Sequence, residues 1–206
     1  MFYPLTDRIN QYRRRLLVGL TALPFAASSA LRTPSAAEGP FYPLPAMRFD
    51  DADSDLVRVD GQVRAAGGEI VRLQGRVLDA SGQAVSGARV EIWQCDARGR
   101  YLHWRDSGGP RDPGFQGFGQ SITDAGGTYG FRTIKPVPYP GRTPHIHVKV
   151  WVDGHDRLTT QFYLQDHPYN QRDGLYRNLS TAELDRVTMI FNHHDEEPVA
   201  TLDLVV

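Results

Sequence analysis

The sequence predicts an all-β fold, an antiparallel β-sandwich with long loops and few short helices. Three observations support this prediction. From residue 69 onward, short runs alternate apolar and polar residues, which is the period of half-buried strands. Clusters of Gly, Asp and Ser separate these runs, as turns between strands do. The 206 residues are enough for one well-buried domain and few for two, so we expect a single domain over residues 33–206.

The first two strands are expected in VRLQGRV (residues 71–77) and ARVEIWQ (residues 88–94), followed by the turns DASGQ and DARGR. Aliphatic residues alternate with polar ones in both, so the aliphatic side chains should face the core. They are Val71, Leu73, Val77, Ala88, Val90 and Ile92. Cys95 is expected to be a small buried residue. As the only cysteine, it excludes an internal disulfide and a cysteine-based zinc site.

A long loop over residues 103–119 is rich in Gly, Pro and aromatic residues, and beyond it the strands QSIT and TYGFRTI flank the turn DAGG. The next stretch, IKPVPYPGRTP, contains four prolines, which lack the N–H group that a central strand donates. We therefore expect a stiff loop over residues 134–144.

The strand HIHVKVWV (residues 145–152) carries two histidines on one face. Ile146, Val148, Val150 and Val152 should point to the core, whereas His145, His147, Lys149 and Trp151 should point away. Residues i and i+2 of a strand lie roughly 6.6 Å apart, so the two imidazoles can converge on one metal ion. The alternative is a solvated outer face that carries two histidines without a function.

The last strands are expected in RLTTQFYL (residues 157–164), VTMIFN (residues 187–192) and ATLDLVV (residues 200–206). Ser180 and Glu183 have the spacing of a capping box, which predicts a helix that begins there.

The N-terminal residues 1–32 are predicted to be an export leader. Three consecutive arginines at positions 13–15 precede the apolar run LLVGLTALPFA and a stretch of small residues, the order typical of a signal peptide and of the twin-arginine route. The run is too short for the roughly 30 Å hydrocarbon core of a bilayer, so no permanent membrane anchor is expected. The protein should be periplasmic or secreted; the alternative is a retained N-terminal helix in a cytoplasmic protein.

The formal net charge of −1 gives no electrostatic reason to expect nucleic acid or an acidic membrane surface as a partner. Specific binding must therefore come from a local pocket. The sequence leaves open whether several copies assemble into a homo-oligomer.

Three segments, EIWQCDARGRY, FGQSITDAGGTYGFRTIKPVPYPGRTPHIH and TTQFY, together resemble the intradiol ring-cleavage dioxygenases, the group of protocatechuate, catechol and hydroxyquinol dioxygenases. The resemblance runs from about residue 33 to about residue 191. It implies that O2 cleaves a catechol-type ring between its two hydroxylated carbons to give a muconate-type product. It also implies that TPSAAEGPFYP lies against the pocket entrance.

The resemblance further implies a mononuclear non-haem ferric ion. Its ligands would be Tyr101, Tyr139, His145 and His147. Phenolates are hard anionic donors that stabilise a trivalent ion, whereas two histidines with one carboxylate suit ferrous oxygenases. Taken alone, either tyrosine would be interpreted as an aromatic residue at the rim of the pocket and not as a metal ligand.

The same resemblance implies a catalytic arginine at Arg142, a supporting glutamine at Gln161, and a second role for Tyr139, which leaves the metal and accepts a proton from the substrate. Arg142 would stabilise negative charge on the ring; the alternative is a surface charge. Gln161 would face the pocket; the alternative is a position on the sheet surface.

Several residues depart from the family pattern or lie outside it. Gly141 stands where the protocatechuate enzymes carry a tryptophan, and Arg105 and Arg111 could bind a substrate carboxylate. The other histidines, at positions 103, 155, 167, 193 and 194, are expected on surfaces or loops. Two alternatives are a secreted sandwich that keeps a metal site without turnover and a ferrous extradiol enzyme, which would need a carboxylate ligand.

Overall fold

The structure, a computed structural model, describes residues 30–62, 64–192 and 196–206. The predicted leader therefore lies almost wholly outside the described residues, as do His193 and His194. Within the described ranges, no helix has the length and apolar character needed to cross a membrane.

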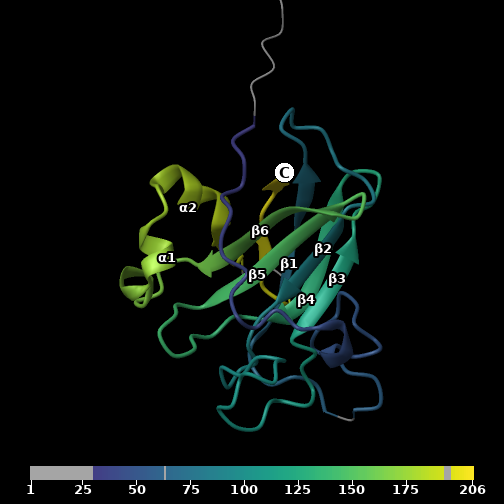
Figure 1. The fold of residues 1–206 in the computed structure, drawn as a ribbon, viewed down its shortest axis with the longest axis vertical. Helices are drawn as coiled ribbons and strands as arrows, with labels where there is room; N and C mark the ends of the chain where they lie inside the picture. The colour runs from purple at the N-terminus through teal and green to yellow at the C-terminus, as the bar shows by residue number, and fades with distance from the viewer. Residues whose placement is uncertain (1–29, 63, 193–195) are drawn as a thin grey trace, which may run out of the picture.

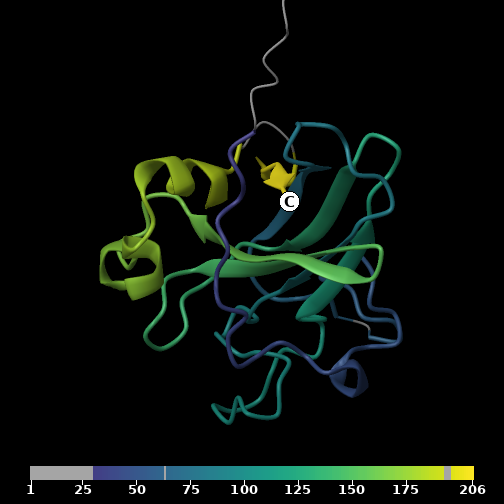
Figure 2. The same ribbon diagram turned by 45° about the horizontal axis from the view of Figure 1, so that its top comes forward.

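Two β-sheets lie one behind the other and form a sandwich (Figure 1). The first sheet consists of β1 (Ile70–Leu78), β4 (Thr128–Ile134), β8 (Val199–Thr201) and β9 (Leu204–Val205). The second has the order β3 (Phe118–Ile122), β2 (Arg89–Trp93), β5 (His145–Val152), β6 (His155–Leu164), β7 (Thr188–Met189). The predicted all-β sandwich is confirmed, and Figure 2 shows the two layers from a second direction.

The strand pairing differs from a purely antiparallel sandwich at the C-terminal strands. β8 and β9 pair with β1 in parallel, and β7 pairs with β6 in parallel. The strands on either side of the DAGG turn also belong to different sheets, because β3 pairs with β2 while β4 pairs with β1. The turn is held by Asp124, whose Oδ1 accepts hydrogen bonds from the N–H groups of Gly126 and Thr128. The chain thus crosses between sheets at this turn.

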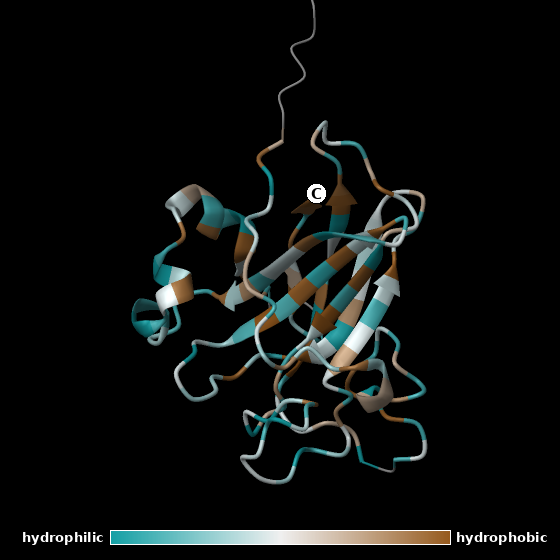
Figure 3. Ribbon diagram, viewed as in Figure 1, coloured by the Kyte–Doolittle hydropathy of each residue, from teal (hydrophilic) through white to brown (hydrophobic). Residues whose placement is uncertain are grey.

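The core lies between the two sheets and is built from the predicted alternation, which is visible as stripes of opposite hydropathy along the strands (Figure 3). All six aliphatic residues predicted to face inward from β1 and β2 are fully buried. Each such side chain contributes on the order of 1.5–3 kcal/mol when it leaves water. The core therefore fixes β2 and β5, the strands that carry or flank the site.

The helices are short. α2 (Thr181–Val187) begins after Ser180 with the predicted capping box, in which Ser180 Oγ accepts from the Glu183 N–H and Glu183 Oε2 accepts from the Ser180 N–H. The sequence analysis missed α1 (Gly174–Arg177) and the 3₁₀ turns η1 (Pro45–Met47) and η2 (Asn170–Arg172). These elements are single turns, too short for a hydrophobic period to show.

The histidine face of β5 is not a solvated surface, so that alternative is wrong. His145, His147 and Lys149 are 1%, 2% and 6% exposed. The reason is the strap, the name we give to residues 33–43, which crosses this face (Figure 1). The strap is tied to β6 by the Ala36 N–H, which donates to Thr159 O, and to β5 by an ion pair between Glu38 and Lys149.

Candidate active site

Four side chains predicted from the sequence as one site meet at the end of β5 nearest its first residue. His145 and His147 come from β5, Tyr101 from the loop after β2, and Tyr139 from the proline-rich loop before β5. The ring centroids are 5.3 Å apart for Tyr101 and Tyr139, 5.6 Å for Tyr139 and His145, and 4.7 Å for the two histidines. The fold therefore gathers residues that are far apart in the chain.

Tyr101 is held rigidly. Its backbone N–H donates to Asp106 Oδ2 at 2.7 Å, and Asp106 Oδ1 also accepts from the Arg100 guanidinium at 3.1 Å. The tyrosine ring stacks on Phe41 of the strap with a centroid distance of 4.8 Å. Packing on one side and the half-buried Asp106 carboxylate behind the backbone hold the ring, which is 1% exposed, in a fixed direction.

Tyr139 is less constrained than Tyr101. It lies between Pro138 and Pro140 outside the named strands, is half-buried, and closes a tight turn in which its carbonyl oxygen accepts the Arg142 N–H at 3.0 Å. Gly141 permits that turn because its φ of +84° lies in the left-handed region. A phenol on such a loop can move more easily than a residue within a strand.

The two histidines point their Nε2 atoms at each other. His145 Nδ1 lies 2.7 Å from the Thr143 carbonyl oxygen, which assigns the ring hydrogen to Nδ1 and leaves a lone pair on Nε2. This Nε2 lies 3.1 Å from His147 Nε2 and 3.4 Å from the Tyr101 hydroxyl oxygen. Three potential donor atoms thus face one point.

His147 is packed between an aromatic ring and a glycine. Its ring stacks on Trp93 at 4.7 Å with an interplanar angle of 6°. On the strap side, a Cβ atom on Gly39 would come within 3.4 Å of His147 Cε1, and Gly39 has a φ of +76°. A Cβ at that distance would make an ordinary van der Waals contact, so it is the left-handed φ that favours glycine at this point of the strap.

The electrostatics of the four residues suit a cation. Burial, aided by the Arg142 charge, lowers the pKa of His145 to about 4, and burial holds the pKa of His147 well below its ordinary value. Burial also raises the pKa of Tyr101 and of Tyr139. The imidazoles are therefore neutral with free lone pairs, and the phenols need a cation close by to become phenolates.

The donor atoms also fit a single ion by spacing. Two imidazole nitrogens bound to one metal ion at about 2.1 Å and at a right angle to each other would stand roughly 3.0 Å apart, close to the 3.1 Å between the two Nε2 atoms. Among the described residues, no group of three or more His, Cys, Asp or Glu side chains gathers to hold a metal ion. The carboxylate that a ferrous extradiol site requires is thus not supplied by this part of the chain.

Arg142 lies beside these residues and is anchored at two nitrogens. Its Nε donates to Asp173 Oδ2 at 2.7 Å, and one terminal nitrogen donates to Gln161 Oε1 at 2.6 Å. Gln161 Oε1 also accepts from the Tyr163 hydroxyl at 3.1 Å, and Gln161 Nε2 donates to Ala37 O of the strap at 2.9 Å. Gln161 faces the site, opposite His147 in the β5–β6 ladder, so the sheet-surface alternative is wrong.

Three further side chains contact the predicted site residues, and only Asp173 among them was not anticipated from the sequence. Asp173 pairs with Arg142, Tyr163 pairs with Gln161, and Phe41 stacks on Tyr101. Burial alone would raise the pKa of Asp173, but hydrogen bonds from the Thr143 N–H and from Arg142 hold it below its ordinary value. The period of β6 places Tyr163 on the face of Gln161, and Phe41 belongs to TPSAAEGPFYP, the segment that the resemblance places against the pocket entrance. No local pattern identifies Asp173.

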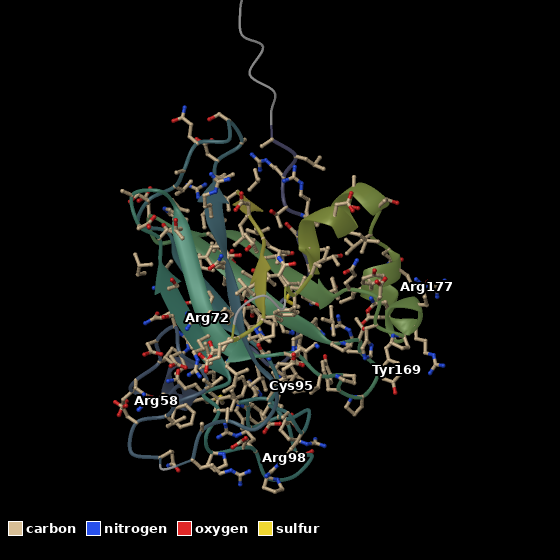
Figure 4. The ribbon with its side chains drawn as sticks, turned by 180° about the vertical axis from the view of Figure 1, so that it is seen from behind. Arg58, Arg72, Cys95, Arg98, Tyr169 and Arg177 are labelled. Atoms are coloured by element: carbon tan, nitrogen blue, oxygen red, sulfur yellow. The ribbon has the colours of Figure 1, made fainter. Side chains whose placement is uncertain are left out.

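The other residues singled out in the sequence do not contribute donor atoms to this point. Arg105 and Arg111 are exposed, and Arg105 lies over the exposed Trp104 ring at 4.9 Å. His155 is exposed, and His103 and His167 are half-buried on loops. Cys95 is buried, as predicted, at the end of the sandwich where the loops gather (Figure 4), and burial raises the pKa of its thiol to about 12.

Comparison with known proteins gives one consistent group of relatives. A family model described as Dioxygenase matches residues 37–203. The protocatechuate 3,4-dioxygenase beta chain of Burkholderia cepacia is 40% identical over 134 residues, which cover 61% of this chain and 57% of that protein. Catechol 1,2-dioxygenase of Acinetobacter baylyi is 30% identical over 196 residues, which cover 84% of this chain and 58% of that protein. The chain thus spans just over half the length of these curated relatives.

Solved structures agree with the fold. The dioxygenase domain of a dioxygenase and carbohydrate-binding protein fusion from Streptomyces sp. SirexAA-E is 30% identical with a TM-score of 0.63, and the match covers 85% of this chain and 97% of that chain. An intradiol ring-cleavage dioxygenase from Tetranychus urticae has a TM-score of 0.66 at 22% identity, with 85% and 94% of the two chains covered. At that identity the second likeness concerns the fold alone.

Proposed function

Because this chain belongs to the intradiol ring-cleavage dioxygenase family, we propose that it is an oxidoreductase that uses O2 to cleave a catechol-type ring between its two hydroxylated carbons. Both oxygen atoms enter the product, which is of the muconate type. The observation that supports this most is the convergence of two tyrosines and two neutral histidines on one point, with the two Nε2 atoms 3.1 Å apart.

The proposed cofactor is a mononuclear non-haem ferric ion, which Tyr101, Tyr139, His145 and His147 would hold. This donor set fits, because two phenolates offset the charge of a trivalent ion while neutral imidazoles supply nitrogen lone pairs. When bound, the ion supplies Lewis acidity that prepares a catechol for attack by O2.

The proposed roles of the two tyrosines follow from how freely each can move, and the proposed role of the arginine follows from its charge. Tyr139, on the loop, accepts a proton from an incoming catechol hydroxyl, whereas Tyr101 stays in place. Arg142 supplies a fixed positive charge for negative charge that develops on the ring, and Gln161 orients that guanidinium. The strap, through Phe41 and Gly39, covers the histidine face and keeps bulk water from it.

The first experiment is to express the protein with iron, purify it, and record its iron content, visible spectrum and oxygen uptake with catechols. We expect about one iron per chain, a visible charge-transfer band from tyrosinate, and oxygen uptake with formation of a muconate-type product. Coloured, iron-containing protein without oxygen uptake would indicate a sandwich that keeps the metal site but only binds a ligand. Colourless protein free of iron would contradict the site itself.

We also propose export, with residues 1–32 as the leader and a small-molecule substrate that is met outside the cytoplasm. The arginine triplet and the apolar run before small residues support this proposal. We expect the mature protein to begin between about Ala27 and Thr33. Mass spectrometry of protein from its native compartment measures this directly, and an intact cytoplasmic chain that starts at Met1 would contradict export while leaving the enzymatic proposal untouched.

A further inference from the structure

Asp173 is a buried carboxylate to which the proposed function assigns no role. Its side chain is 0% exposed, and it lies between η2 and α1, where it contacts the loop that precedes β5. Removing an ionised carboxylate from water is costly unless donors surround it. The donors that surround the Asp173 carboxylate therefore indicate its role.

The two oxygens of Asp173 serve two different segments. Oδ2 accepts from Arg142 Nε at 2.7 Å and from the Thr143 N–H at 2.9 Å. Oδ1 accepts from the N–H groups of Leu175 and Tyr176, at 2.9 and 3.3 Å, and so caps α1. One carboxylate thus ties the loop that bears Arg142 to the first turn of a helix.

The orientation of Arg142 depends on two anchors. Asp173 holds Nε, and Gln161 Oε1 holds one terminal nitrogen at 2.6 Å. A planar guanidinium whose two nitrogens are held by two different residues is restricted in its last torsions. With Gln161 alone, the side chain would regain rotamer freedom, since arginine is among the residues with the most such freedom to lose.

We propose that Asp173 is a positioning residue for ring cleavage, which fixes the direction and balances the charge of the Arg142 guanidinium beside Tyr139. The proposal rests on the proposed function, because Arg142 acts on the ring there. Its specific content is that Asp173 acts through Arg142, and that its capping of α1 is a separate, structural contribution.

Asp173→Asn is the informative substitution. All four partners of the carboxylate are N–H donors, whereas an asparagine side chain presents one oxygen and one NH2 group. The NH2 group must therefore face donors on one side, either Arg142 and Thr143 or the first turn of α1. We expect kcat/KM for a catechol to fall by about 10- to 100-fold, because misplacement of a functional group by about 1 Å can cost on the order of 10²-fold, with iron content unchanged.

A double-mutant cycle separates positioning from general damage. If Asp173 acts through Arg142, Asp173→Asn should lower the rate of an Arg142→Ala protein by less than about 2-fold, because the two residues are directly coupled. If Asp173 only stabilises the fold, the two losses should multiply, which would overturn the proposal. Ser180→Ala is the matched control: it removes the cap of α2 without contact to Arg142 and should keep the parent rate.

A readout that does not depend on turnover completes the test. In the metal-free full-length chain labelled with ¹⁵N-arginine, the Arg142 Nε–H bound to Asp173 should give a slowly exchanging NMR signal that Arg142→Ala removes. Asp173→Asn should shift this signal or abolish it, and Ser180→Ala should leave it in place. An unchanged signal in Asp173→Asn overturns the proposal whatever the activity. A parent protein that cleaves no catechol overturns the proposed function and the role of Asp173 in it, so the two failures are distinguishable.

Discussion

Replacement of Arg142 with alanine should leave iron binding and the tyrosinate colour in place while turnover falls by about 10²- to 10³-fold. The reason is that the guanidinium is assigned to charge that develops on the ring, and loss of one such preorganised donor typically costs that factor in rate. Arg142 is not among the four proposed ligands, so the metal should stay. Steady-state oxygen uptake, iron analysis and a visible spectrum of the same preparation measure the three quantities.

The substitution also has a cost for stability that must be separated from the effect on rate. Removing Arg142 leaves the carboxylate of Asp173, which is 0% exposed, without its charged partner. Breaking a buried pair in this way costs roughly 3 kcal/mol of unfolding free energy. Arg142→Lys is the companion variant, because it keeps a charge but cannot make the same fork of hydrogen bonds.

The two arginine variants are therefore expected to differ in both stability and rate. Arg142→Lys should fold nearly as well as the parent and fall between the parent and Arg142→Ala in rate. Thermal unfolding of each metal-loaded protein shows whether a slow variant is folded. A folded Arg142→Ala protein that cleaves catechol at the parent rate would show that the assigned role is wrong.

The longer strands were predictable because each depends on a local pattern. The last two predictions were wrong in extent, since VTMIFN forms a strand only over β7 and ATLDLVV is divided between β8 and β9. The alternation in β1, β2 and β5 identifies the strand and the face that packs in the core, and all six inward residues predicted in the first two strand segments are fully buried. In β5 the opposite face is buried as well, which alternation does not indicate. Pairing depends on distant segments. Nothing local indicates that the DAGG turn sends the chain from one sheet to the other, or that β8 and β9 pair with β1 in parallel.

The candidate site was predictable in part for a similar reason. His145 and His147 belong to one strand, and the resemblance to a family supplied Tyr101, Tyr139, Arg142 and Gln161. The burial of the histidine face was not predictable from the strand, because the strap that covers it comes from more than a hundred residues earlier in the chain. Only the resemblance placed the strap segment, TPSAAEGPFYP, against the pocket entrance. Asp173 was not predicted for the same reason, because its importance depends on a contact with Arg142, 31 residues away.

The largest loss of iron is expected for His147→Ala. The His147 ring is confined between Trp93 and Gly39, and its Nε2 faces that of His145 at 3.1 Å. Alanine removes one of two fixed nitrogen donors, and among the described residues no further His, Cys, Asp or Glu side chain gathers with the pair to replace it. We expect a loss of iron affinity at least as large as the roughly 10- to 100-fold that follows loss of an outer-shell partner, with loss of activity in proportion. His155→Ala, which changes an exposed histidine, is the control and should keep parent iron content.

Tyr139→Phe should behave differently, because the loop tyrosine is proposed to leave the metal when substrate arrives. Tyr101, His145 and His147 stay in the variant, so it should still bind iron and keep part of the tyrosinate band. It lacks the phenol that accepts a proton from the catechol, so the substrate complex should form slowly, as stopped-flow absorbance would record. Tyr139 is half-buried between prolines, whereas Tyr101 is locked by Asp106 and Phe41, so only the former has room to move. An unchanged visible spectrum with catechol binding at the parent rate would show that Tyr139 is never on the metal, and equal iron loss in Tyr139→Phe and His147→Ala would show that the loop ligand is as fixed as the strand ligands.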